Sequence, residues 1–335
     1  MSAITRSFLK KTIVSALGSK VISNPRLRAM RRNHLVTVLN IHRVDDHLGS
    51  AYEAIQPALF YEFVVWLKEH FHLTTFRKLN SIVSWDKPVL ILSFDDGYRD
   101  FIEIVVPMLD SLAVEVNQNI IPDCVDTGRP PISVMIQDFI GTAPEKLLRE
   151  IAFPGLPNGI RGLDRVRAGL RASAAIKYRP ILEQKELMSE LEPQFYRFDG
   201  YKTTPMMALN QIKEIAPLHE IGVHSFEHAT MTAETDEYLV KDASRCLTWF
   251  KSNSISEPTV YAFPNGAAHQ RHSELLHRNG FPTVLLVGEA FTCAHTWLHK
   301  RFTFYAKSLA EARFRATGGL AHTRLPRQPG SLRAI

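Results

Sequence analysis

The sequence predicts an α/β protein built on a parallel sheet or barrel, with a mostly helical insertion. Apolar runs of strand length alternate with segments of helical periodicity along much of the chain. One run, residues 88–94 (PVLILSF), is continuously apolar, as is typical of a strand covered on both faces. It leads into Asp95, Asp96 and Gly97 and then into a helical pattern. Two carboxylates therefore follow a buried strand, at the end where α/β folds carry their chemistry.

The expected elements follow one another with short connections, except at residues 126–204. That stretch is rich in Arg, Gly and Pro and is expected to be an insertion beside the core, because structureless loops of that length are uncommon. Strands are expected over 35–41, 88–94, 113–121, 221–224, 259–263, 282–287 and 302–305. Helices are expected over 57–71, 101–112, 145–151, 181–191, 205–216 (with Thr204 as its cap), 236–250, 271–279 and 309–315. A barrel over 35–310 would thus lie between two basic segments, 1–34 and 311–335.

Charge is distributed unevenly, although the net charge of the 335 residues is only +6. Residues 1–34 carry eight Lys or Arg and no acid, residues 299–335 carry eight and one acid, and the stretch between them has a net charge of −9. Basic ends fit contact with an anionic membrane or a phosphorylated ligand, and they equally fit solvated tails. No nucleic-acid partner is expected. An N-terminal amphipathic helix is an option, because apolar residues share one of its faces: Ile4, Phe8, Leu9, Ile13 and Leu17.

The cysteines and the apolar stretches bear on the compartment. Three cysteines without short spacing argue against a disulfide framework and against a Cys-based zinc site. The apolar stretch at 12–18 is too short for a secretory signal, and no apolar run approaches the roughly 18–20 residues that span a bilayer. A cytoplasmic protein is expected, with peripheral contact at the inner face of the membrane as an option.

A second chemical signal is HSFEH at residues 224–228, which follows a short apolar strand as the acid pair does. His224 and His228 share one face if the segment turns helically, and neutral imidazoles suit Zn²⁺ or a similar divalent ion. Strand ends of this kind open on the same face of a parallel core. One carboxylate and two histidines make three protein ligands and leave a position open for water, which is the arrangement of a catalytic site. The second carboxylate is then free to act as a base.

Three motifs in order carry a family resemblance: SFDDG at 93–97, HSFEH at 224–228 and YAFPNG at 261–266. Together with NIHRV at 40–44, they resemble the NodB-like polysaccharide deacetylases (carbohydrate esterase family four), over roughly 35–305 apart from the insertion. The resemblance implies an irregular (β/α) barrel of about seven strands. It also implies a metal-dependent hydrolase that uses metal-activated water to remove an N-acetyl, less often an O-acetyl, group from a carbohydrate. A cell-surface glycan or glycolipid precursor is the expected substrate.

The resemblance also implies roles for individual residues. Asp96, His224 and His228 would bind the metal, with Zn²⁺ expected and Co²⁺, Ni²⁺ or Mn²⁺ as options. Asp95 would be the general base. The backbone N–H of Asn265, in the turn that Pro264 begins, would donate to the oxyanion. The candidates for the oxyanion and substrate contacts are Asn265, Pro264 and Tyr98. Tyr98 is included for its residue type, because its ring could stack on a sugar, but packing in the core is the favoured alternative.

Two departures from the family pattern leave two roles open. The third motif lacks the Arg that usually orients the base, and Arg301 could reach in from another strand end or could equally be solvated. The usual late Leu-x-His motif, source of the general acid, is not evident. His42, at the end of the first strand, is the better candidate for that acid. Two alternatives remain: a metal-dependent amidase acting on a non-sugar amide or cyclic imide, and a catalytically inactive binding module.

Overall fold

The computed structural model describes residues 18–46, 49–157, 159–160 and 164–321. The apolar face expected for an N-terminal amphipathic helix, residues 4–17, lies outside the described residues, as does most of the basic C-terminal segment. Helix α2 (Lys20–Arg32) is the first described element. No helix in the described part combines the length and the apolar character that crossing a bilayer requires.

Seven parallel strands close into a barrel, because β1 pairs with both β3 and β8. The barrel strands are β1 (Val36–Ile41), β3 (Val89–Phe94), β4 (Asn117–Ile120), β5 (Glu220–Val223), β6 (Val260–Ala262), β7 (Thr283–Val287) and β8 (Leu298–Thr303). A short eighth strand, β2 (His72–Thr74), pairs with the first half of β3, and β4 pairs with the last two residues of β3. Strands β1 and β3 are buried along their whole length. The predicted irregular (β/α) barrel of about seven strands is confirmed.

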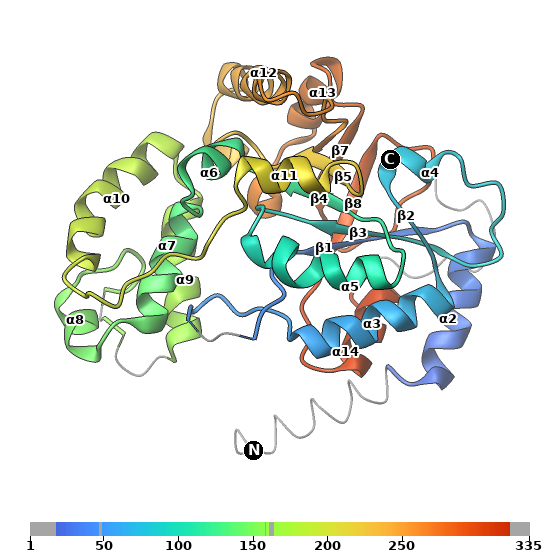
Figure 1. Ribbon diagram of the computed structural model, residues 1–335, viewed down its shortest axis with the longest axis horizontal. Helices are drawn as coiled ribbons and strands as arrows, with labels where there is room; N and C mark the ends of the chain where they lie inside the picture. The colour runs from blue at the N-terminus through green and yellow to red at the C-terminus, as the bar shows by residue number, and fades with distance from the viewer. Residues whose placement is uncertain (1–17, 47–48, 158, 161–163, 322–335) are drawn as a thin grey trace.

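Helices cover the barrel on its outer side (Figure 1). In Figure 1, α12 and α13 lie above the strands, and α3, α5 and α14 lie below them. Apolar side chains of these helices and of the strands form one large core around the barrel. The helical elements outside the insertion are α3 (Pro57–His70), α4 (Phe76–Leu79), the π-helical turn η1 (Phe101–Val105), α5 (Val106–Ser111), α11 (Leu209–Ile215), η2 (Met231–Ala233), α12 (Asp236–Ser252), η3 (Pro264–Gly266), α13 (Gln270–Arg278) and α14 (Leu309–Ala316).

The segment between β4 and α11 forms a helical lobe beside the barrel, at the left of Figure 1. Its helices are α6 (Pro122–Thr127), α7 (Ile132–Thr142), α8 (Glu145–Glu150), α9 (Arg165–Lys177) and α10 (Ile181–Phe195). The lobe has its own apolar core, in which Phe139 stacks on Phe195 with ring centroids 4.1 Å apart. The sequence pattern indicated α8 and α10 but not α7 and α9. Helix α7 is buried at every position from 133 to 140 and so has no amphipathic pattern, and the buried face of α9 consists mainly of small residues.

Buried polar contacts join the lobe to the barrel. Arg43, just after β1, bonds to Asp100 at 2.9 Å and lies 3.4 Å from the Thr204 hydroxyl. Thr204 donates its backbone N–H and its hydroxyl to the carboxylate of Asp138 on α7, at 2.6 and 2.9 Å. The expectation that Thr204 caps a helix is therefore wrong, and α11 begins after Ala208 instead. The buried Asp138 carboxylate needs donors, and Thr204 supplies two of them.

Two strands differ from the expected ranges by more than one residue at an end. The expected strand over 113–121 is confined to Asn117–Ile120, because Ala113 has a φ of 49° and Val114 donates to Leu109 in the turn that ends α5. The expected strand over 302–305 is β8, which begins at Leu298. Its alternating residues point into the barrel, so polar side chains that resemble a basic tail in the sequence form part of a buried wall.

One inward-facing residue of β8, His299, gives a pH-dependent contribution to stability. Its side chain is buried, its Nδ1 lies 3.0 Å from the Thr292 hydroxyl, and its ring centroid lies 5.1 Å from that of Phe76. Burial lowers the pKa of His299 to about 4. The unfolded chain binds the proton at an ordinary pKa of about 6.5, so stability falls between about pH 6.5 and about pH 4, by up to roughly 3 kcal/mol.

We expect His299→Gln to reduce this slope in the free energy of unfolding. Urea denaturation of wild type and variant between about pH 7.5 and about pH 4 measures it. The control is His295→Gln, because His295 is exposed. Equal slopes for wild type and His299→Gln would contradict the assignment of this proton uptake to His299.

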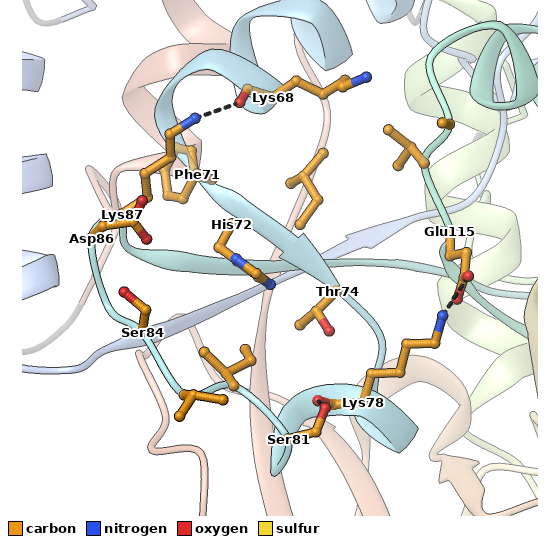
Figure 2. A pocket seen from close by; sticks show the side chains of 15 residues that line it. Lys68, Phe71, His72, Thr74, Lys78, Ser81, Ser84, Asp86, Lys87 and Glu115 are labelled. Atoms are coloured by element: carbon orange, nitrogen blue, oxygen red, sulfur yellow. Dashed lines mark hydrogen bonds and ion pairs between the residues drawn. The ribbon is translucent and has the colours of Figure 1, made fainter.

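A cavity of 760 Å³ opens at the amino ends of β3 and β4, away from the strand ends where the sequence places the acid pair. Figure 2 shows it between Lys68, Lys87 and Ser84 on one side and Glu115 and Lys78 on the other. Lys78 reaches Glu115 at 2.5 Å, and Lys87 donates to the backbone carbonyl of Lys68 at 3.0 Å. These lysines already have partners, and the cavity contains none of the predicted site residues.

Candidate metal centre and active site

A second cavity, of 270 Å³, lies at the carboxyl ends of the barrel strands and gathers the predicted site residues. Its lining includes eight of them: His42, Asp95, Asp96, Tyr98, His224, His228, Asn265 and Arg301. The ninth, Pro264, is buried but does not line the cavity. A neighbouring cavity of 240 Å³ shares His42 and Tyr52 with it and extends the space toward α9.

Asp96, His224 and His228 form a cluster in which the candidate ligand atoms all lie within 4.8 Å of one another. Oδ1 of Asp96 lies 3.5 Å from Nε2 of each histidine. This oxygen is buried and has no hydrogen-bond partner among the described residues. Nδ1 of His224 lies 2.9 Å from the carbonyl oxygen of Ala262 and must donate to it, which leaves Nε2 as a free lone pair. The donor set and the unpartnered oxygen fit a divalent cation.

The histidine pair is brought together by a turn and not by a helix, so the expected helical spacing is wrong. Strand β5 ends at Val223, and both Ser225 and His228 have left-handed backbones, with φ of 62° and 60°. The buried carboxylate of Asp242 on α12 holds this turn by accepting hydrogen bonds from the Ser225 hydroxyl and the Phe226 N–H, both at 2.9 Å. Asp242 fixes the turn that carries the two histidines without lining the cavity, and its role could not be read from the motif.

Unfavourable backbone conformations concentrate at this cavity. Eight described non-glycine residues have positive φ, and four of them lie in the motifs that form the site. These four are Asp96, Ser225, His228 and Asn265. Such conformations cost about 1–3 kcal/mol each and persist where the surrounding structure fixes them, commonly at functional sites.

Asp95 is held beside the cluster by two donors. Its Oδ1 accepts from Nη1 of Arg301 at 2.8 Å and from Nδ2 of Asn119 at 2.9 Å, while its buried Oδ2 has no hydrogen-bond partner among the described residues. Oδ2 lies 3.8 Å from Nε2 of His224. Burial alone would raise the pKa of Asp95, but the interaction with Arg301, followed by that with His224, outweighs this effect and holds the pKa below its usual range. Asp95 is therefore an oriented, ionised carboxylate.

Arg301 and Asn119 belong to a polar network inside the barrel. Arg301 is 0% exposed and projects from β8, so the alternative of a solvated Arg is wrong. The Ser93 hydroxyl lies 3.3 Å from Arg301 Nη1, accepts from Asn119 at 3.2 Å and donates to Asn117 at 2.8 Å. The sequence contained a signal for this network, since two asparagines two residues apart in a buried strand must find polar partners there.

Aromatic side chains line the cavity near His42. The His42 ring meets Tyr52 edge to face at 6.2 Å, and Tyr52 meets Tyr98 in the same way at 6.1 Å. Burial lowers the pKa of His42, against the opposing charges of Asp96 and Asp95. Tyr98 is 1% exposed and also packs against Arg43, so it has no open face for a sugar. This burial agrees with the favoured alternative, in which Tyr98 packs in the core, and not with stacking on a sugar.

The third motif forms the tight turn η3 at the end of β6. Asn265 adopts a φ of 57°, and its side-chain amide donates to the Thr230 hydroxyl at 2.8 Å. Asn265 and Gly266 line the cavity, while Pro264 packs behind them. The turn therefore presents the backbone around Asn265 to the space beside the cluster of Asp96, His224 and His228.

Comparison with known proteins points to the same family as the three sequence motifs. A family model described as polysaccharide deacetylase matches residues 196–284, which include both histidines and the third motif. Residues 196–284 are thus similar to the polysaccharide deacetylase family. Among curated proteins, none matches it significantly. The family match confirms the resemblance predicted from the sequence, and with it the enzyme class: a carbohydrate deacetylase, a hydrolase of amide bonds.

Solved deacetylase structures share the fold of the domain. The deacetylase PplD of Streptococcus pyogenes, solved in complex with acetate, aligns with a TM-score of 0.55 and 13% identity over 83% of this chain and 96% of its own. IcaB from Ammonifex degensii aligns with a TM-score of 0.53 and 15% identity, over 84% and 97%. A polysaccharide deacetylase from Bacillus cereus aligns with a TM-score of 0.53 and 13% identity, over 84% and 69%. At these identities the likeness concerns the fold.

Proposed function

We propose that this protein is a metal-dependent carbohydrate N-deacetylase whose metal ligands are Asp96, His224 and His228. The observation that carries the proposal is the clustering of these three ligand atoms beside a second, oriented carboxylate, Asp95. Two imidazoles and one carboxylate favour Zn²⁺, with Co²⁺, Ni²⁺ or Mn²⁺ as alternatives. A divalent ion bound there supplies Lewis-acid chemistry, which polarises the acetyl carbonyl and lowers the pKa of the attacking water.

The side chains around the ligands would divide the proton transfers between them. Asp95 Oδ2 is the free oxygen that accepts a proton from the attacking water, while Arg301 and Asn119 hold the other oxygen in place. The backbone N–H of Asn265 is the proposed donor to the oxyanion. His42 is the proposed donor of a proton to the leaving amine, since it lines the same cavity.

Metal content and acetate release test this proposal together. We expect wild type to hold about one Zn²⁺ per chain and to release acetate from N-acetylated sugars, because three protein ligands suffice for a catalytic site. Asp96→Ala and His224→Ala should lose both properties. The matched control is His295→Ala, because that histidine is exposed and lies outside the cluster. Wild type that binds no metal after reconstitution would refute the proposal.

The substrate and the location are proposed more broadly. The substrate is taken to be a cell-surface glycan or a glycolipid precursor, and a metal-dependent amidase on a non-sugar amide is the alternative. The inactive binding module is disfavoured, because Arg301 occupies the base-orienting place that the third motif leaves vacant. A cytoplasmic location with contact between the basic ends and an anionic membrane stays a prediction, since residues 1–17 and 322–335 lie outside the described residues.

A further inference from the structure

One wall of the active-site cavity is built by the helical lobe and not by the barrel. Helix α7 contributes Ser133 and Gln137, and α9 contributes Leu170, Ser173 and Lys177. The three residues of α9 are spaced by three and four positions, so they share one face of the helix. The lobe therefore forms part of the surface that a substrate meets.

Polar side chains on this wall have no partner within the described part of the chain. Ser133, Gln137 and Ser173 are 7%, 4% and 6% exposed, yet no hydrogen bond joins their side chains to another described group. The Lys177 ammonium makes no described ion pair, and it lies 5.2 Å from the ring of Tyr178. Buried polar groups normally have partners, so these groups are available to a ligand.

The charges around the cavity favour an anionic ligand. Its charged lining residues are Asp95, Asp96, Arg301 and Lys177, which together sum to zero. Arg301 pairs with Asp95 through Nη1, although its Nε and Nη2 have no described partner, so Lys177 is the cation among them that makes no described ion pair. A divalent ion held by the cluster would make the cavity strongly positive. Burial lowers the pKa of Lys177 and Asp96 opposes this, which indicates an ammonium in a partly desolvated position near the cluster.

We propose that Lys177, with Ser173 and Gln137, binds a carboxylate or phosphate group that the substrate carries next to its acetylated amino sugar. The inference rests on the proposed function and narrows its substrate to anionic carbohydrates. The lobe would then determine specificity while the barrel performs the hydrolysis. A charge-assisted hydrogen bond at a site of low water content supplies the discrimination against neutral sugars.

Calorimetric binding to the zinc-loaded full chain tests this subsite with three probes. These are methyl N-acetylglucosaminide, N-acetylglucosamine phosphate and N-acetylmuramic acid, which are neutral, phosphorylated and carboxylated. We expect wild type to bind at least one anionic sugar about tenfold or more tightly than the neutral one. Lys177→Met should abolish that preference and Lys177→Arg should largely retain it. Lys146→Met is the control, because Lys146 is exposed on α8 of the same lobe.

Acetate release from the same probes separates this inference from the proposed function. If no probe releases acetate but the Lys177-dependent preference is present, the deacetylase function fails and the subsite stands. If wild type shows no preference, or Lys177→Met keeps it, the subsite is refuted. A Lys177→Met variant with lower kcat on neutral and anionic probes alike, at unchanged Kd, would refute it in favour of a proton-donating lysine. The identity of the preferred probe distinguishes a phosphate from a carboxylate.

Discussion

Replacing Asp95 with Asn is expected to lower kcat for acetate release by about 10²–10⁴-fold, the usual contribution of a general base. The amide is nearly isosteric and can still accept from Arg301, so the fold and the cavity should persist. The metal content should stay at the wild-type level, because the proposed ligands are Asp96, His224 and His228. Elemental analysis and an acetate assay on the same preparation measure both quantities.

The matched control for this substitution is Asp199→Asn, which changes an exposed aspartate of the lobe. That variant should keep both activity and metal. If Asp95→Asn lost the metal, Asp95 would be a ligand, and the division of labour between the two adjacent acids would be wrong. If it kept full activity, another group would have to accept the proton.

Replacing Arg301 with Met is expected to lower the free energy of unfolding by about 3–5 kcal/mol near neutral pH. The guanidinium is 0% exposed and lies 2.8 Å from Asp95, so its removal leaves a buried carboxylate without its countercharge. The pKa of Asp95 in the folded variant then rises above its unfolded value. The loss of stability relative to wild type is therefore largest above this raised pKa. It shrinks as the pH falls through that pKa and continues to shrink below about 4, where Asp95 in folded wild type is still ionised.

A double-mutant cycle in urea, on chelator-treated protein, isolates this interaction. The variant Asp95→Asn with Arg301→Met removes the buried charge as well as its partner, so it should be more stable than Arg301→Met alone. If the changes in unfolding free energy of the two single variants added up to that of the double variant, this result would contradict a direct charge pair. Activity gives a second measurement, because Arg301→Met should also lower kcat through a poorly oriented base.

The candidate metal centre could be predicted from the sequence because its residues follow strands whose patterns are strong. Residues 88–94 are continuously apolar and end at Asp95 and Asp96, and the carboxyl ends of parallel strands meet at one end of a barrel. Local chemistry and this topological rule were enough to place the acids with His224 and His228. The family resemblance then suggested a role for each residue. The structure brings eight of these nine residues into one cavity.

Tertiary structure decided the contacts that no local pattern encodes. Arg301 lies 206 positions from Asp95 and reaches it because β8 and β3 both flank β1 in the closed barrel. Lys177 reaches the cavity because buried contacts such as that between Thr204 and Asp138 hold the lobe against the barrel. The sequence alone determined which residues are proposed to carry the chemistry, since strand patterns and motifs are local. The partners that orient and surround them depend on barrel closure and lobe packing, which bring together residues distant in the chain.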